Sequence, residues 1–108
     1  MEFTAQQISV LERLHAFDFQ IVAFPMYANY VGVRKGNCAV LLAPAATGHF
    51  KLHGQPAYLI GGNFSVRVTR EGRDWFVWKR EKIEVTAERL AELEKFTAQL
   101  LQTLIPVI

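Results

Sequence analysis

The sequence predicts an α+β domain in which an antiparallel meander of about five to seven short strands is flanked by an N-terminal helix and a longer C-terminal helix. Helical periodicity is confined to the two ends of the chain, and short apolar runs separated by Gly and Pro fill the middle. Strands that follow one another without alternating helices indicate antiparallel pairing and the α+β class. The length fits a single domain over residues 1–108.

The first helix begins with a capping box. Thr4 is the N-cap and Gln7 lies three residues further on, while Phe3 and Ile8 have the spacing of a hydrophobic staple. Apolar residues then recur at three- and four-residue spacing. This pattern predicts a helix over residues 5–16.

The middle of the chain consists of short apolar runs between turn residues. A run over residues 18–24 ends at Pro25, and the runs 30–34 and 38–43 are separated by a glycine-containing turn. Further short strands are expected within residues 50–69, where Gly and Pro interrupt the chain again.

Residues 67–80, RVTREGRDWFVWKR, are the most charged and most aromatic segment and are predicted to form most of a β-hairpin. Two registers are compatible with the sequence, and a slip of one residue exchanges the two faces of a strand. We favour a three-residue loop ending at Gly72, because it joins Phe76 and Trp78 to the inner apolar face and needs a left-handed residue only where glycine is present. A two-residue loop would leave these two aromatic side chains outside. In the favoured register, the outer face carries Arg67, Trp75, Val77 and Lys79.

The last helix is the longest predicted element. Thr86 is its N-cap, Glu88 lies in the first turn, where the helix dipole favours an acidic side chain, and Pro106 ends it. Residues 105–108 form an apolar tail that is a candidate for an intermolecular contact. The buried side of this helix is expected to comprise Leu90, Leu93, Thr97, Leu100 and Leu104, with Phe96 and Leu101 widening it.

Charge is distributed unevenly along the chain, although the net charge is only +2. No Asp or Glu lies between Asp18 and Glu71, whereas the last helix is rich in Glu. The middle of the chain is therefore expected to give a mildly positive surface. This asymmetry is compatible with an anionic ligand, with head-to-tail contact between copies, or with the ordinary scarcity of acidic residues in strands.

Few residues suggest catalysis or metal binding. His49 and His53 lie four residues apart and are candidate metal ligands together with His15 or Cys38, but neither a CxxC nor an HExxH motif accompanies them. Cys38 opens an apolar strand, where a buried structural thiol is expected. We therefore expect neither a metal site nor a cofactor, and an enzyme is not favoured.

The single cysteine excludes an internal disulfide, so a cytoplasmic location is expected. No apolar run approaches the length of about 18 residues that a membrane span needs. The start of the chain lacks the basic and apolar regions of a signal peptide. A membrane location is therefore not expected.

The first functional hypothesis is a non-enzymatic contact module. Two helices can cover one face of a small sheet, and the other face, with Trp and Arg, is then available to a second copy or a protein partner. Nucleic acid is not expected, because acidic residues interleave with the basic ones and the net charge is low. The alternative is a domain that binds a small anionic or apolar ligand between the sheet and the last helix, with Tyr27, Tyr30 and Tyr58 at the mouth of the pocket.

Overall fold

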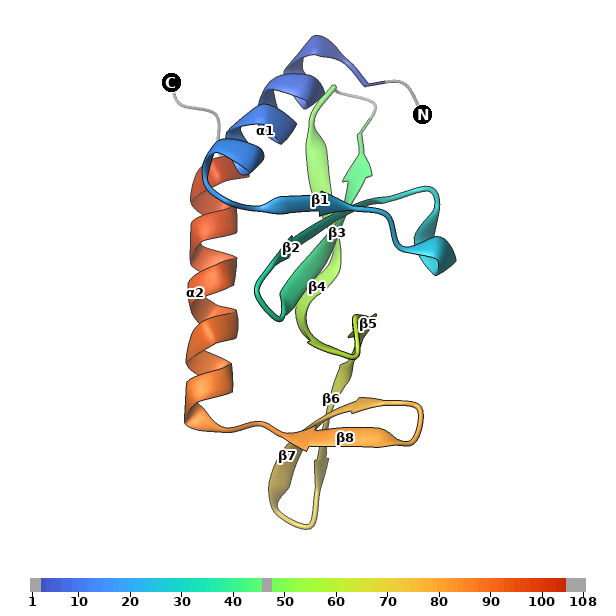
Figure 1. The fold of residues 1–108 in the computed structure, drawn as a ribbon, viewed down its shortest axis with the longest axis vertical. Coiled ribbons are helices and arrows are strands. Elements are labelled where there is room, and N and C mark those ends of the chain that lie inside the picture. The colour runs from blue at the N-terminus through green and yellow to red at the C-terminus, as the bar shows by residue number, and fades with distance from the viewer. Residues whose placement is uncertain (1–2, 46–47, 105–108) are drawn as a thin grey trace.

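The computed structural model describes residues 3–45 and 48–104, which form two helices and two antiparallel sheets (Figure 1). The α+β class is confirmed. The apolar tail 105–108, predicted as a candidate for an intermolecular contact, lies outside the described residues. The elements in chain order are α1 (Ala5–Ala16), β1 (Gln20–Val22), the 3-10 turn η1 (Pro25–Tyr27), β2 (Val31–Lys35), β3 (Cys38–Pro44), β4 (Phe50–Ile60), β5 (Asn63–Phe64), β6 (Val66–Arg70), β7 (Arg73–Trp78), β8 (Glu81–Glu84) and α2 (Ala87–Leu104).

Both sheets are meanders, because each strand pairs with the next strand in the chain. The large sheet has the order β1-β2-β3-β4-β5 and the small sheet has the order β6-β7-β8. Strand β8 was not predicted, since its sequence EKIE contains a single apolar residue.

Neither of the two described helices is long and apolar enough to cross a membrane.

The predicted capping box at the start of α1 is confirmed. The Thr4 hydroxyl accepts a hydrogen bond from the Gln7 backbone N–H at 3.1 Å, and the Gln7 side-chain oxygen accepts one from the Thr4 N–H at 3.0 Å. The same side chains also donate to the carbonyl oxygens of Gly48 and His49. The cap therefore ties α1 to the start of β4 as well as starting the helix.

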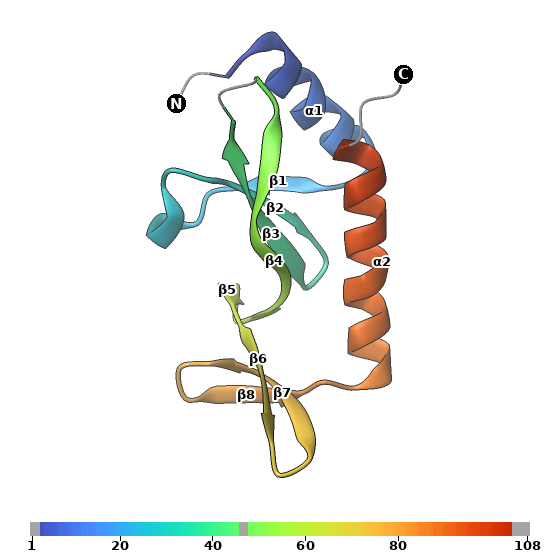
Figure 2. The ribbon, with the colours of Figure 1, turned by 180° about the vertical axis from the view of Figure 1, so that it is seen from behind.

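Both helices cover one face of the large sheet, which we call the inner face (Figures 1 and 2). Alternate residues of the strands point to it, and Val33, Val40 and Leu42 are each fully buried there. On the helix side, Leu14 of α1 and Leu100 of α2 are fully buried as well. This contact between helices and sheet forms the main core.

Part of the other face of the large sheet, around Gly32, is covered by the chain itself. Phe24, just before η1, lies so close over Gly32 that a Cβ atom at Gly32 would be 2.4 Å from the ring. Phe24 in turn packs on Phe64 of β5, with ring centroids 4.6 Å apart. Tyr27 also packs on Phe64, and the centroids of these two rings are 5.7 Å apart. Glycine at position 32 thus allows the loop to pack on this part of the face.

The two sheets meet at Tyr58 and Phe76, whose rings stack with centroids 5.2 Å apart. The buried Ser65 hydroxyl, between β5 and β6, donates to the Tyr58 carbonyl oxygen. Helix α2 begins near the small sheet, runs along the large sheet and returns the chain to α1 (Figure 2). The molecule measures about 47 × 28 × 20 Å.

The predicted register of the β6–β7 hairpin is wrong. Arg70 pairs with Arg73, so the loop has only two residues, Glu71 and Gly72, with φ values of 53° and 74°. Two consecutive residues with positive φ are typical of the tight type I′ turn, which matches the twist of a hairpin. The prediction failed because it assumed that only glycine would adopt the left-handed conformation here.

Candidate functional site: the outer face of the small sheet

The register places four apolar side chains on one face of the small sheet. Val66 pairs with Val77, and Val68 pairs with Trp75, so these four residues share a face, which we call the outer face. Val66 is 66% exposed, and the other three side chains are partly exposed. The described part of the chain thus leaves an apolar sheet surface partly open to solvent.

Charged residues surround this apolar centre. Arg70 and Arg73 lie at its hairpin end, and β8 adds Lys82 opposite Val77 and Glu84 opposite Trp75. The Lys82 ammonium lies 4.6 Å from the centroid of the Trp75 ring, which is a cation–π distance. An apolar centre with a charged margin is the usual anatomy of a protein contact surface.

The opposite face of the small sheet packs against the core of the molecule. Phe76 is only 2% exposed, because it stacks on Tyr58, and Ile83, its partner on β8, packs against the core. Phe76 and Trp78 were both predicted to face inward. Phe76 is part of the core and Trp78 packs against it, so this prediction is confirmed. The error concerns β6, whose two faces are exchanged relative to the prediction.

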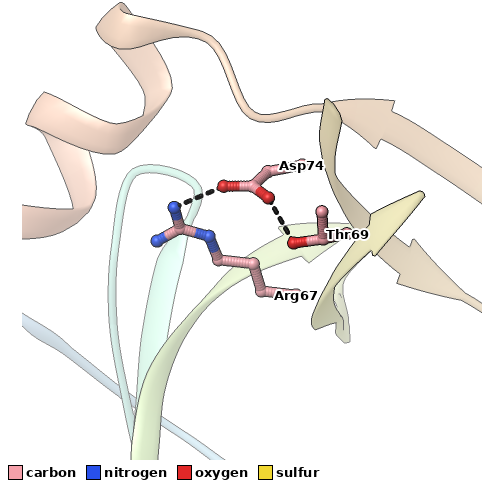
Figure 3. A network of polar contacts seen from close by, with 3 residues as sticks. All are labelled: Arg67, Thr69 and Asp74. Carbon is pink, nitrogen blue, oxygen red and sulfur yellow. Dashed lines mark hydrogen bonds and ion pairs between the residues drawn. The ribbon is translucent and has the colours of Figure 1, made fainter. Parts of the chain in front are cut away.

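Arg67 consequently does not belong to the outer face. It pairs with Phe76 across the hairpin, and its guanidinium meets the Asp74 carboxylate at 2.7 Å (Figure 3). The Thr69 hydroxyl donates to the other oxygen of Asp74. Hydrogen bonds from Thr69 and then from Arg67 lower the pKa of the Asp74 carboxyl. Arg67 also lines a groove beside the α2 residues Leu90, Leu93 and Leu101.

The four residues predicted for the contact surface are thus divided. Trp75 and Val77 lie together on the outer face, whereas Arg67 lies on the other face. Lys79 lies in the turn between β7 and β8 with a φ of 53°, and its ammonium is 4.7 Å from the Trp78 ring. Val66 and Val68 join this face because the hairpin has the two-residue loop at Glu71-Gly72, the alternative register that the sequence did not favour.

The three tyrosines of the alternative ligand pocket lie on different faces. Tyr58 is buried on the inner face, where its hydroxyl accepts a hydrogen bond from Asn37 Nδ2 at 3.3 Å. Tyr27 packs on Phe64 on the other face, and Tyr30 stacks on His53 with centroids 4.0 Å apart. The structure does not bring the three together around one opening.

Cys38, His49 and His53 are also separated. Cys38 is fully buried on the inner face, and burial, followed by the charge of Glu92, raises the pKa of its thiol to about 12. A thiol in this state is protonated and shielded, so it is not a nucleophile. His53 lies on the other face of the sheet, opposite Leu41, while His49 lies beside the start of α1. Within residues 3–45 and 48–104, no three His, Cys, Asp or Glu side chains are grouped to hold a metal.

Comparisons with protein-family models, with curated proteins and with solved structures found no match to this chain. Function is therefore inferred from the geometry of the chain alone.

Proposed function

We propose that the protein is a non-enzymatic contact module that forms a homodimer through the outer face of the small sheet. The observation that carries this proposal is the 66% exposure of Val66 beside three further apolar side chains on the same face. Removing such a surface from water stabilises an association roughly in proportion to the apolar area buried. Trp75 lies among these side chains, and tryptophan is enriched among the residues that dominate binding energy.

The charges around the outer face favour a second copy as the partner. A two-fold interface brings the same surface together twice, so it has to be complementary to itself. The outer face carries both signs, because Glu84 shares it with Arg70, Arg73 and Lys82. Glu84 of one copy can therefore pair with a cation of the other, while the two apolar centres pack as sheets do in a sandwich.

Native mass spectrometry at micromolar protein concentration tests this proposal. The expected result is a dimer for the wild-type chain and a monomer for Val66→Lys, since the new charge would be buried without a partner in the interface. Met26→Lys is the matched control, because Met26 is 80% exposed in the η1 turn and lies outside the small sheet. A monomeric wild type, or an equal loss of dimer in both variants, would overturn the proposal.

A further inference from the structure

A second candidate site lies where the C-terminal ends of α1 and α2 meet the end of β2. A cavity of about 360 Å³ opens there, which is within the range of small-molecule sites. It is lined by Arg13 and Phe17 from the end of α1, by Lys35 from β2, and by Gln99 and Thr103 from α2. The described residues that line it include two cations and no acidic side chain.

Each of the two cations is held by acceptors at the helix ends. The Arg13 guanidinium donates to the Thr103 carbonyl oxygen at 3.2 Å. The Lys35 ammonium donates to the Phe17 carbonyl oxygen at 3.0 Å and to the Gln99 side-chain oxygen at 3.3 Å. Gln99 and Thr103 are one helical turn apart, so both cationic groups lie along the same short stretch of α2.

Within the part of the chain that the structure describes, these contacts leave several hydrogen-bond donors of the cavity without an acceptor. Arginine carries five N–H donors, and Arg13 uses one of them in the side-chain bonds of the described residues. Its Nε atom is buried and has no acceptor in that part of the chain. Lys35 uses two of its three donors, and Gln99 accepts from Lys35 with its amide oxygen, which leaves its amide nitrogen to donate. The side chains of the cavity thus offer more hydrogen-bond donors than the acceptors at the helix ends use.

The charge balance points to a ligand with one negative charge. Each helix C-terminus carries a partial negative charge of about one half, so the two helix ends offset part of the charge of Arg13 and Lys35. An adjoining hollow shares Lys35 and Gln99 and adds Lys95 and Glu92, whose charges are opposite and balance. A net charge near +1 suits a carboxylate better than a doubly charged phosphate.

Aromatic side chains supply an apolar wall. Phe17 is 61% exposed beside the cavity, and Phe19 lies beneath the Lys35 ammonium, 4.8 Å from it to the ring centroid. We propose that this cavity binds a small carboxylate attached to an aromatic or other apolar body. The carboxylate would accept from Arg13, Lys35 and the Gln99 amide, while the apolar body would cover Phe17.

An NMR titration tests this site without knowledge of the natural ligand. 2-Naphthoate is added to the ¹⁵N-labelled protein, and 2-naphthamide is added in parallel as a neutral molecule of the same shape. The expected result is that naphthoate shifts the amide signals around Arg13, Lys35 and Gln99, and that naphthamide binds at least tenfold more weakly. Equal binding of both compounds, shifts elsewhere in the molecule, or no shifts at millimolar concentration would overturn the proposal.

Two variants locate the charge that is recognised. Lys35→Gln is expected to weaken naphthoate binding by about tenfold, since it removes a charge-assisted hydrogen bond. Arg13→Lys retains a cation that can reach the Thr103 carbonyl but loses the planar fork, so weaker binding is expected with the fold preserved. Lys51→Gln on β4, an exposed position away from the cavity, is the matched control. Unchanged binding in both cavity variants, with their folded spectra intact, would contradict the assignment.

Discussion

The large sheet and the small sheet differ in how many of their faces the chain covers. In the large sheet, Val33 on the inner face is fully buried, and Leu41 on the other face is only 5% exposed. In the small sheet, Phe76 is 2% exposed on one face, whereas Val66 is 66% exposed on the other. Both sheets have apolar residues on both faces, so composition alone does not distinguish a covered face from an open one.

The largest expected effect comes from the covered side of the small sheet. Phe76→Ala is expected to lower the free energy of unfolding by about 3–5 kcal/mol, because it removes a buried ring and leaves a cavity beside Tyr58. Val66→Ala should change it by no more than about 0.5 kcal/mol when the chain is monomeric, since that side chain is exposed. Urea unfolding of the two variants at low protein concentration measures both values. Similar losses in both would mean that the outer face also contributes to folding.

The same comparison shows which parts of the fold were predictable. The capping box of α1 was predictable because both of its hydrogen bonds join residues three positions apart. The β6–β7 register was not, because the burial of Phe76 against Tyr58 is a tertiary contact and Glu71 adopts a positive φ. Local patterns thus located the elements, whereas long-range packing decided which β6 side chains remain outside.

The candidate sites were predictable to a similar extent. The face on which Trp75 and Val77 lie was predicted, since alternation along a single strand needs no knowledge of the register. The cavity at Arg13 and Lys35 was missed, because no local pattern indicates that the ends of two helices distant in sequence meet at β2. The approach of Phe24 to Gly32 is likewise visible only in three dimensions.

A second prediction concerns the far face of the large sheet. Gly32→Ala is expected to lower the free energy of unfolding by about 1–3 kcal/mol, because the added Cβ would lie 2.4 Å from the Phe24 ring and 2.5 Å from the Val22 carbonyl oxygen. Thermal or urea unfolding measures the loss. Adding Phe24→Leu should recover only part of it, since the contact with the Val22 backbone remains. Full stability of Gly32→Ala would show that this face is less tightly covered than the geometry indicates.

A third prediction uses the buried thiol of the large sheet. The pKa of Cys38 is raised from 9.0 to about 12 in the folded chain, so the folded state keeps its proton where the unfolded state releases it. The corresponding stability is complete well below pH 9 and is lost as the pH rises from there toward 12, by about 1.4 kcal/mol for each pH unit. Urea unfolding at pH 8 and pH 10 should show this loss in the wild type but not in Cys38→Val. An identical pH dependence in both chains would contradict the burial of this group.

The smallest effect is expected at the exposed ion pair of the small sheet. Hydrogen bonds from Thr69 and Arg67 lower the pKa of Asp74, so the stability that they contribute is present above the carboxyl's unfolded pKa and is lost as the pH falls through the folded one. Because these side chains are exposed, the loss should be much smaller than that at Cys38. An NMR titration of the Asp74 carboxyl tests the cause: Thr69→Ala should raise its pKa more than Arg67→Gln does, since the hydroxyl bond makes the larger contribution. The reverse order would mean that the charge of Arg67 dominates, and that Arg67 is bound to Asp74 too firmly to turn toward a partner.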